Sequence, residues 1–263
     1  MPREERWLNT IKAIADFNQA IELDSNYARA YATRGLTYTA IGEFELAIKD
    51  YNQALELRPN YAWAYANRGR TNSLRKEYLQ SINDLDRAIE IDPNYAWAYI
   101  SRGYTHLWLK DVAQARMDFI QSLELDPKNV ERRWMVVWTG MGPERPEDGI
   151  IERLEATASV DPENRWALVC RGVALWLNRN FEETLTLLDQ AITLKPVASD
   201  PYFWKGMAYA SLAQDPAAIA AIEQSLELEL PPILLTPLRW FEQDRPDFYQ
   251  KYVVPLLARY DLE

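Results

Sequence analysis

The sequence contains one cysteine and one histidine, and its apolar residues never gather into a long run. A lone cysteine, Cys170, forms no internal disulfide, which favours a reducing compartment and predicts a cytoplasmic location. No apolar segment approaches the roughly 18 residues needed to cross a bilayer. The opening residues, MPREERWLNT, also lack the apolar stretch of a secretory signal. We therefore expect no membrane partner.

Positive charge is also scarce, because 29 basic residues stand against 39 acidic ones and the formal net charge is −10. Nucleic-acid-binding proteins usually carry a basic stripe, so this balance predicts no nucleic-acid partner. A cationic partner is compatible with the charge, but the solubility of an extended protein is the simpler explanation.

Catalytic motifs are missing as well. The sequence has no GxxxxGK[ST], GxGxxG, GxSxG or HExxH pattern, and no Cys/His cluster with metal-ligand spacing. His106 falls at a helix-packing position, and Cys170 has no histidine near it in the sequence, although Arg171 follows it. We interpret His106 as a core or partly buried structural residue and Cys170 as a small packing residue. The sequence therefore predicts a protein that is not an enzyme and binds no metal ion or cofactor.

What the sequence does contain is a repeat. The segments Ala30–Tyr61, Ala64–Tyr95 and Ala98–Asn129 resemble one another, and both a glycine and a proline recur every 34 residues. These are Gly35, Gly69 and Gly103, and Pro59, Pro93 and Pro127. Such a period is typical of a stacked array of helical pairs, each with a break between its two helices and a proline after the second. Arrays of this kind display a long surface, which favours a binding scaffold.

These residues resemble the tetratricopeptide repeat, whose pattern is an aromatic residue, then Gly, Tyr, Ala, an aromatic residue, Ala and Pro at fixed offsets. The match is strong from Ala28 to Asn129, and Gly172 and Gly206 keep it in phase later. The resemblance, to a bacterial type of array, implies an all-α fold. It would be a right-handed α–α superhelix of about six helical pairs, with a partial N-terminal unit and a C-terminal cap.

We expect a single domain over residues 1–263. It has a partial unit, 1–27, then repeats 28–61, 62–95, 96–129, 130–164, 165–198 and 199–232, and capping helices over 233–263. The repeat 130–164 is degenerate, because Trp138 stands where glycine is expected and helix breakers fill its turn. Its first helix should end near Met141 and its second begin near Asp148. In the cap, Pro246 should open the final helix and Pro255 should kink it.

Two columns of charged residues share the period. Arginines precede the repeat glycine, and aspartates precede the inner aromatic residue of the second helices: Arg34, Arg68, Arg102 and Arg171, and Asp16, Asp50, Asp84 and Asp118. A ladder of Arg–Asp pairs explains both columns, since arginine binds a carboxylate through two hydrogen bonds. A row of arginines for anionic ligands is the alternative, and we favour the ladder. Because the aspartates stop after Asp118, Arg171 is the arginine expected to be free.

In this family the ligand surface is the concave face, which the first helices form. Carrying its groove positions onto this chain predicts a peptide-binding surface of aromatic, arginine and small polar side chains, which are typical of binding hot spots. Its members are Arg29, Thr33, Leu36, Trp63, Asn67, Arg70, Trp97, Ser101, Tyr104, Arg132, Trp166 and Trp176. Packing on neighbours, for example of Trp63 on Tyr61 or Tyr95, explains the tryptophans equally well.

Some family members hold the acidic C-termini of heat-shock chaperones with a clamp of lysine, asparagine and arginine. Only Asn67 fits that clamp here, so we do not expect a chaperone-tail partner.

The sequence thus predicts a non-catalytic scaffold that binds a protein or peptide on its concave face. The alternative is the sensor or partner-binding domain of a larger bacterial multidomain regulator, since the resemblance extends to such proteins. The helix predicted over Ile11–Leu23 lacks the first helix that would normally cover Ile14 and Phe17. Exposed apolar stripes often bind other proteins, so we expect a second interaction surface on this helix. A homodimer contact is one form that this surface could take.

Overall fold

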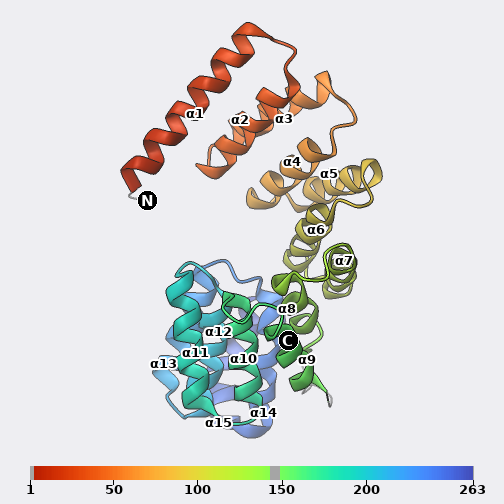
Figure 1. Ribbon diagram of the computed structural model, residues 1–263. Coiled ribbons are helices and arrows are strands. Elements are labelled where there is room, and N and C mark those ends of the chain that lie inside the picture. Colours follow the sequence, from red (N-terminus) through yellow and green to blue (C-terminus); the bar gives the residue numbers. More distant parts are fainter. Residues whose placement is uncertain (1–2, 143–148, 263) are drawn as a thin grey trace. The chain divides into compact units, whose positions relative to one another are not determined.

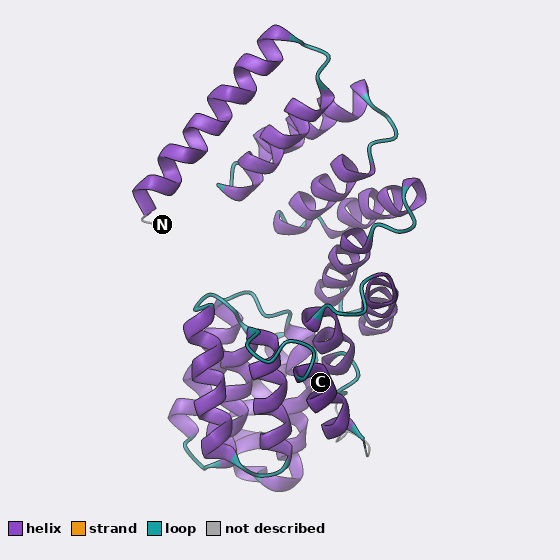
Figure 2. Ribbon diagram, viewed as in Figure 1, coloured by secondary structure: helices purple, strands orange, loops and turns teal. Residues whose placement is uncertain are grey.

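The computed structural model describes residues 3–142 and 149–262, and every regular element within them is a helix (Figures 1 and 2). The all-α prediction is confirmed. The helices form two compact units, Met1–Thr105 and His106–Glu263, which we call the N-terminal unit and the C-terminal unit. The single domain expected from the sequence stays a prediction.

First and second helices alternate along the chain after α1 (Arg3–Leu23). The first helices are α2 (Ala28–Ala40), α4 (Ala62–Leu74), α6 (Ala96–Trp108), α8 (Val130–Trp138), α10 (Arg165–Leu177) and α12 (Asp200–Ser211). The second helices are α3 (Phe44–Leu57), α5 (Tyr78–Ile91), α7 (Val112–Leu125), α9 (Ile150–Ala158), α11 (Phe181–Leu194) and α13 (Asp215–Glu227). The chain then continues through η1 (Pro232–Trp240), α14 (Phe241–Asp244), α15 (Pro246–Phe248), a π-helical turn η2 (Tyr249–Val253) and α16 (Val254–Arg259).

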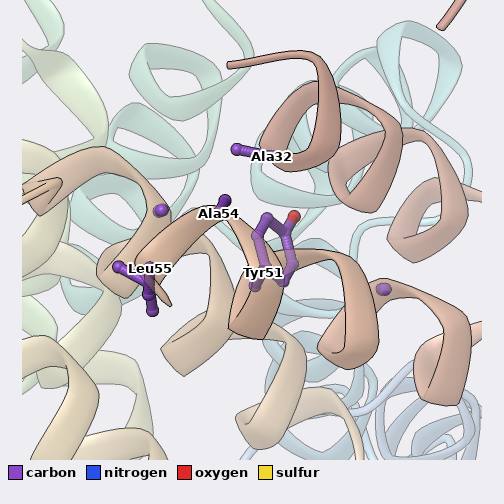
Figure 3. Packing of buried hydrophobic residues seen from close by; sticks show 6 residues of the cluster. Ala32, Tyr51, Ala54 and Leu55 are labelled. Atoms are coloured by element: carbon purple, nitrogen blue, oxygen red, sulfur yellow. The ribbon is translucent and has the colours of Figure 1, made fainter. Parts of the chain in front are cut away.

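The repeat glycine lets the two helices of a pair approach closely. A Cβ atom at Gly69 would lie 2.9 Å from Leu85 Cγ and 3.0 Å from the Ser81 carbonyl oxygen, which is closer than carbon atoms pack. The space beside the glycine is filled by a large side chain of the second helix. In the first full pair this is Tyr51, which is fully buried with Ala32, Ala54 and their neighbours (Figure 3).

The arginine and aspartate columns form the predicted ladder in the N-terminal unit. Arg34 donates from Nε and Nη2 to the two carboxylate oxygens of Asp50, each at 2.7 Å, and Arg68 holds Asp84 in the same way. Each arginine also reaches the preceding second helix, where Nη1 donates to the amide oxygen of Asn18 or Asn52. We call these contacts the arginine ladder.

Arg102 also reaches the preceding second helix, at the position that Asn18 and Asn52 occupy in the earlier repeats. Arg102 donates from Nη1 to Asp86, on the second helix before it. Asp16 is exposed and forms no ion pair with the described residues. Arg171, expected to be free, likewise forms no ion pair within residues 3–142 and 149–262. The ladder is therefore the correct explanation for Arg34 and Arg68, and the arginine row is not.

The N-terminal helix is longer than the sequence predicted. It begins at Arg3 rather than near Ile11 and packs on α2. The predicted boundary was wrong because the apolar pattern of the repeat starts at Ile11, whereas the charged residues before it continue the helix without contributing to that pattern.

The degenerate unit is a helical pair, as predicted, but with short helices. Helix α8 ends at Trp138, before Met141, and α9 begins at Ile150. Asp148, where the second helix was expected to begin, lies outside the described residues. Trp138 is fully buried and stacks on Phe203 at 5.8 Å between ring centroids, while Trp204 lies 6.1 Å away. An aromatic cluster therefore occupies the place where a glycine contact was expected.

The C-terminal segment is helical but broken. Pro246 opens α15, as predicted. Pro255 lies near the start of α16, directly after the π-helical turn. The helix irregularity predicted at this proline therefore lies just before it.

Candidate functional site

The first helices of the N-terminal unit carry nine of the residues predicted to form the peptide-binding face. They are Arg29, Thr33, Leu36, Trp63, Asn67, Arg70, Trp97, Ser101 and Tyr104. We call these residues the first-helix face. The residues that follow the repeat glycines are accessible to solvent. Arg70 is exposed, and Leu36 and Tyr104 are partly exposed.

Two tryptophans form the apolar part of the first-helix face. Trp63 stacks on Tyr61 with ring centroids 5.9 Å apart, and Trp97 stacks on Tyr95 at 6.1 Å. Both tryptophans remain half-buried, so each ring packs on the repeat with one part and meets solvent with another. Burial raises the pKa of Tyr95 to about 12. The rings therefore serve packing while leaving apolar surface open.

The small polar residues of this face are tied to the backbone. Asn67 is buried and its Nδ2 donates to the Trp63 carbonyl oxygen at 2.7 Å. Thr33 Oγ1 donates to the Arg29 carbonyl oxygen at 2.8 Å. These bonds stay within single helices, so Asn67 and Thr33 shape the face more than they offer free polar groups to a ligand.

The charge of the face is positive, although the chain carries −10 in total. Helices α2, α4 and α6 contain no aspartate or glutamate. Arg29 and Arg70 are exposed and form no ion pair with any described residue, whereas the ladder arginines are matched by carboxylates of the second helices. Arg70 lies over Trp97, with Cζ 6.0 Å from the ring centroid. Cationic and aromatic groups thus lie together on this face.

The predicted groove residues of the C-terminal unit are placed differently. Arg132 and Trp176 are buried, and Arg132 Nη1 donates to Asp126 at 2.8 Å. Trp166 is half-buried, with the Arg165 guanidinium carbon only 3.5 Å from its ring centroid. The positions that match Leu36, Arg70 and Tyr104 are also buried, and they are Thr139, Val173 and Met207.

The chain's own C-terminal segment covers these helices. Trp240 packs on Trp176 with centroids 5.7 Å apart, and its Nε1 donates to the Gly142 carbonyl oxygen at 3.2 Å. Arg245 Nη1 donates to the Ala210 carbonyl oxygen at 2.8 Å. Within the C-terminal unit the segment therefore contacts α10, the end of α12 and the turn after α8. Of the first-helix positions predicted to bind a peptide, those of the N-terminal unit are the open ones.

Comparisons with known proteins agree with this architecture. The family model described as "TPR repeat" matches residues 35–72, and the one described as "Tetratricopeptide repeat" matches residues 64–95 and 199–230. Residues 35–95 and 199–230 are tetratricopeptide repeats. No curated protein matched it in sequence.

Three solved structures share the fold. One is a repeat protein from Parabacteroides merdae ATCC 43184, 15% identical, with a TM-score of 0.62 and coverage of 86% of this chain and 91% of that one. Another is YrrB, described as having an unusual peptide-binding site, 24% identical, with a TM-score of 0.50 and coverage of 68% and 92%. The Cut9–Hcn1 complex is 17% identical, with a TM-score of 0.62 and coverage of 97% and 51%.

The two residues considered for catalysis are packing residues of the repeat. Cys170 is fully buried, and desolvation raises the pKa of its thiol, so it holds no reactive thiolate near neutral pH. His106 takes the position of Tyr38 in the first full repeat and lies 3.9 Å from the Asp118 carboxylate, with little exposed surface. Among the described residues, no group of three or more acidic, histidine or cysteine side chains could hold a metal ion. No described helix has the length and apolar character to cross a membrane.

Proposed function

We propose that the N-terminal unit binds a peptide segment of another protein on its first-helix face, and that this segment is acidic. The observation that carries the proposal is the charge of the face. Its three helices hold no acidic residue, and Arg29 and Arg70 are exposed without an ion pair. Carboxylates of a partner would supply the counter-charges that the chain itself supplies to the ladder arginines.

Trp63 and Trp97 supply the apolar contacts in this proposal. Tryptophan and arginine are the residue types most enriched in binding hot spots, and truncating such a residue typically weakens binding by about 2 kcal/mol or more. The two rings occupy the same position in successive repeats and are half-buried on their tyrosines. They are already held in place, so binding would order few side chains. An extended segment with apolar side chains between acidic ones matches this surface.

The charge carries a second consequence. Arg29 and Arg70 are exposed, so their attraction to a partner is screened by salt, and it acts more on the association rate and on selectivity than on the total affinity. The proposal therefore predicts that an acidic segment binds faster and tighter at low ionic strength. The protein would act without catalysis and in the cytoplasm, a location that a buried unpaired cysteine favours.

Fluorescently labelled peptides of about ten residues test the proposal, alternating Glu with Leu, Gln with Leu or Lys with Leu. The Glu peptide should bind most tightly, and Arg70→Gln should weaken it about threefold to tenfold. Lys49→Gln, which removes an exposed charge on second helix α3, is the matched control and should leave affinity unchanged. Equal binding of the Glu and Gln peptides would contradict the acidic part of the proposal.

The tryptophans are tested in the same titration. The double variant Trp63→Ala and Trp97→Ala should lose more than about 30-fold in affinity for the Glu peptide. Trp166→Ala changes the corresponding position of the C-terminal unit and should leave that affinity unchanged. Melting curves of each variant separate lost binding from lost folding. A double variant that melts earlier but keeps its affinity would show that the rings only pack.

A second copy of the chain is the partner proposed for α1. Ile11 is 56% exposed and Leu23 is 82% exposed, so this helix leaves apolar surface in water. The wild type should then form a dimer in light scattering at about 100 µM, and Ile11→Glu should abolish it. Leu79→Glu, at an exposed leucine of α5, is the control. A monomeric wild type at that concentration would refute this contact.

A further inference from the structure

A cavity of about 230 Å³ lies in the C-terminal unit, where the turn between α10 and α11 meets the end of α12 and the C-terminal segment. Four aromatic rings line it, those of Trp176, Phe181, Trp240 and Phe241. Trp176 and Trp240 lie 5.7 Å apart with their planes 30° from each other, and Phe241 stands nearly perpendicular to Trp176 at 76°. The cavity is separate from the first-helix face, which belongs to the other unit.

The aromatic walls are fixed before any ligand binds. Trp176, Trp240 and Phe241 are buried side chains. Trp176 Nε1 donates to Ser211 Oγ at 3.0 Å, and Ser211 Oγ donates to the Met207 carbonyl oxygen at 2.9 Å. The indole donor of Trp176 is therefore already used, and its ring offers the cavity an apolar surface. A preformed apolar pocket with a few convergent polar groups is the usual form of a small-ligand site.

Two guanidinium groups lie at the cavity. Arg179 is exposed and forms no ion pair with a described residue. Arg245 uses Nη1 for the Ala210 carbonyl oxygen and the Asp215 carboxylate, which positions the group while its other nitrogens make no hydrogen bond to a described residue. Asp244 also lines the cavity, and it sets one negative charge against the two guanidinium groups. The polar side of the cavity therefore favours an anion.

Size limits the ligand further. A cavity of about 150 Å³ is enough for benzene, whereas drug-sized ligands occupy roughly 300 Å³ or more. The observed volume fits one six-membered ring with a small substituent. We propose that this cavity binds an aromatic carboxylate, with the ring against the aromatic walls and the carboxylate at Arg179. The ligand is either a free small acid or the C-terminus of a peptide that ends in phenylalanine, since both carry an aromatic ring and a carboxylate.

The backbone at Arg179 gives no separate support. Its φ of 63° is left-handed, but Lys76, Lys110 and Ala213 have similar values in the corresponding turns of other repeats. The conformation is a property of the repeat. What distinguishes Arg179 from these residues is the aromatic cavity beside it.

Calorimetric titration of the full chain with phenylacetate tests the proposal, with phenylacetamide and phenethylamine as neutral and cationic counterparts. Phenylacetate should bind with saturation below about 10 mM and at least about tenfold more tightly than the amide. Arg179→Gln should remove that preference for the acid. Lys76→Gln, at the same turn position of the N-terminal unit, should keep it. Both variants should leave binding of the Glu peptide unchanged.

Two peptides that end in phenylalanine, one with a free carboxylate and one amidated, distinguish a peptide ligand from a small acid. Tighter binding of the free-acid peptide than of phenylacetate would identify a peptide terminus as the ligand, and the reverse would identify a small acid. The proposal is overturned if phenylacetate shows no saturation, if the acid and the amide bind equally, or if phenethylamine binds best.

Discussion

The arginine ladder predicts a large difference between two neighbouring aspartates of α5. Asp84 accepts hydrogen bonds from Arg68 Nε at 2.9 Å, from Arg68 Nη2 and from Asn72 Nδ2 at 3.1 Å. Its side chain is 10% exposed and that of Arg68 is 23% exposed. Asp86, two residues further along α5, accepts a hydrogen bond from Arg102 Nη1, and its side chain is 45% exposed. The two substitutions Asp84→Asn and Asp86→Asn therefore compare a buried pair with an exposed one.

The magnitude follows from what each substitution leaves behind. Asp84→Asn removes the negative charge and one of the two acceptor oxygens, so Arg68 stays largely buried without its counter-charge. Its remaining acceptors are Asn52 and at most one amide oxygen of the new side chain. Breaking a fully buried pair costs about 3–5 kcal/mol, and the partial exposure of Arg68 lowers this to about 2–3 kcal/mol. Asp86→Asn should cost less than about 1 kcal/mol, as exposed pairs do.

Hydrogen exchange measures the difference locally, which matters because repeat arrays need not unfold as one unit. A loss of about 2–3 kcal/mol corresponds to a roughly 30- to 150-fold loss of protection in α4 and α5. Asp86→Asn should change protection there by less than about fivefold. If both variants lose the same protection, the ladder does not stabilise the N-terminal unit and the reasoning is wrong.

Three further substitutions have defined outcomes. Gly206→Ala places a Cβ atom 2.5 Å from Ile222 Cγ1 and should destabilise the C-terminal unit by about 1–3 kcal/mol in urea unfolding, whereas Gly142→Ala meets nothing within 4 Å and should not. Trp138→Gly restores the residue typical of the repeat, yet it should cost about 3–5 kcal/mol because the ring is buried among other aromatic rings; an unchanged melting temperature would contradict this. Burial raises the pKa of Tyr51 from 10.0 to about 12, so the unfolded chain releases this proton first and stability falls as the pH rises from 10 to 12. Tyr51→Phe should make that fall shallower, and an identical slope would refute the assignment.

The features that the sequence predicted well are those with a fixed offset along the chain. Arg34 meets Asp50 and Arg68 meets Asp84 at a separation of 16 residues. A repeat places such pairs in register wherever both residue types recur, so the columns alone identify the contacts. The packing positions of Cys170, which is buried, and His106, which is partly buried, were predictable for the same reason.

The features that the sequence did not predict are contacts between distant and non-repeating residues. Trp240 meets Gly142 at a separation of 98 residues, and Lys110 Nζ donates to the Tyr260 carbonyl oxygen at a separation of 150. No column records such contacts, because the C-terminal segment occurs once. The burial of Trp176 follows from them, and this is why the predicted groove residues of the C-terminal unit differ from those of the N-terminal unit. The single available signal was the density of tryptophan and phenylalanine after Phe203.

Charge reversal on the first-helix face is the most direct test of the proposed function. In the variant Arg29→Glu with Arg70→Glu, the two exposed cations of the face become anions while the ladder stays intact. We predict that the wild type binds the Glu peptide more tightly than the Lys peptide, and that the variant reverses this order at low salt. If the variant keeps the order of the wild type, the first-helix face of the N-terminal unit does not select an acidic partner.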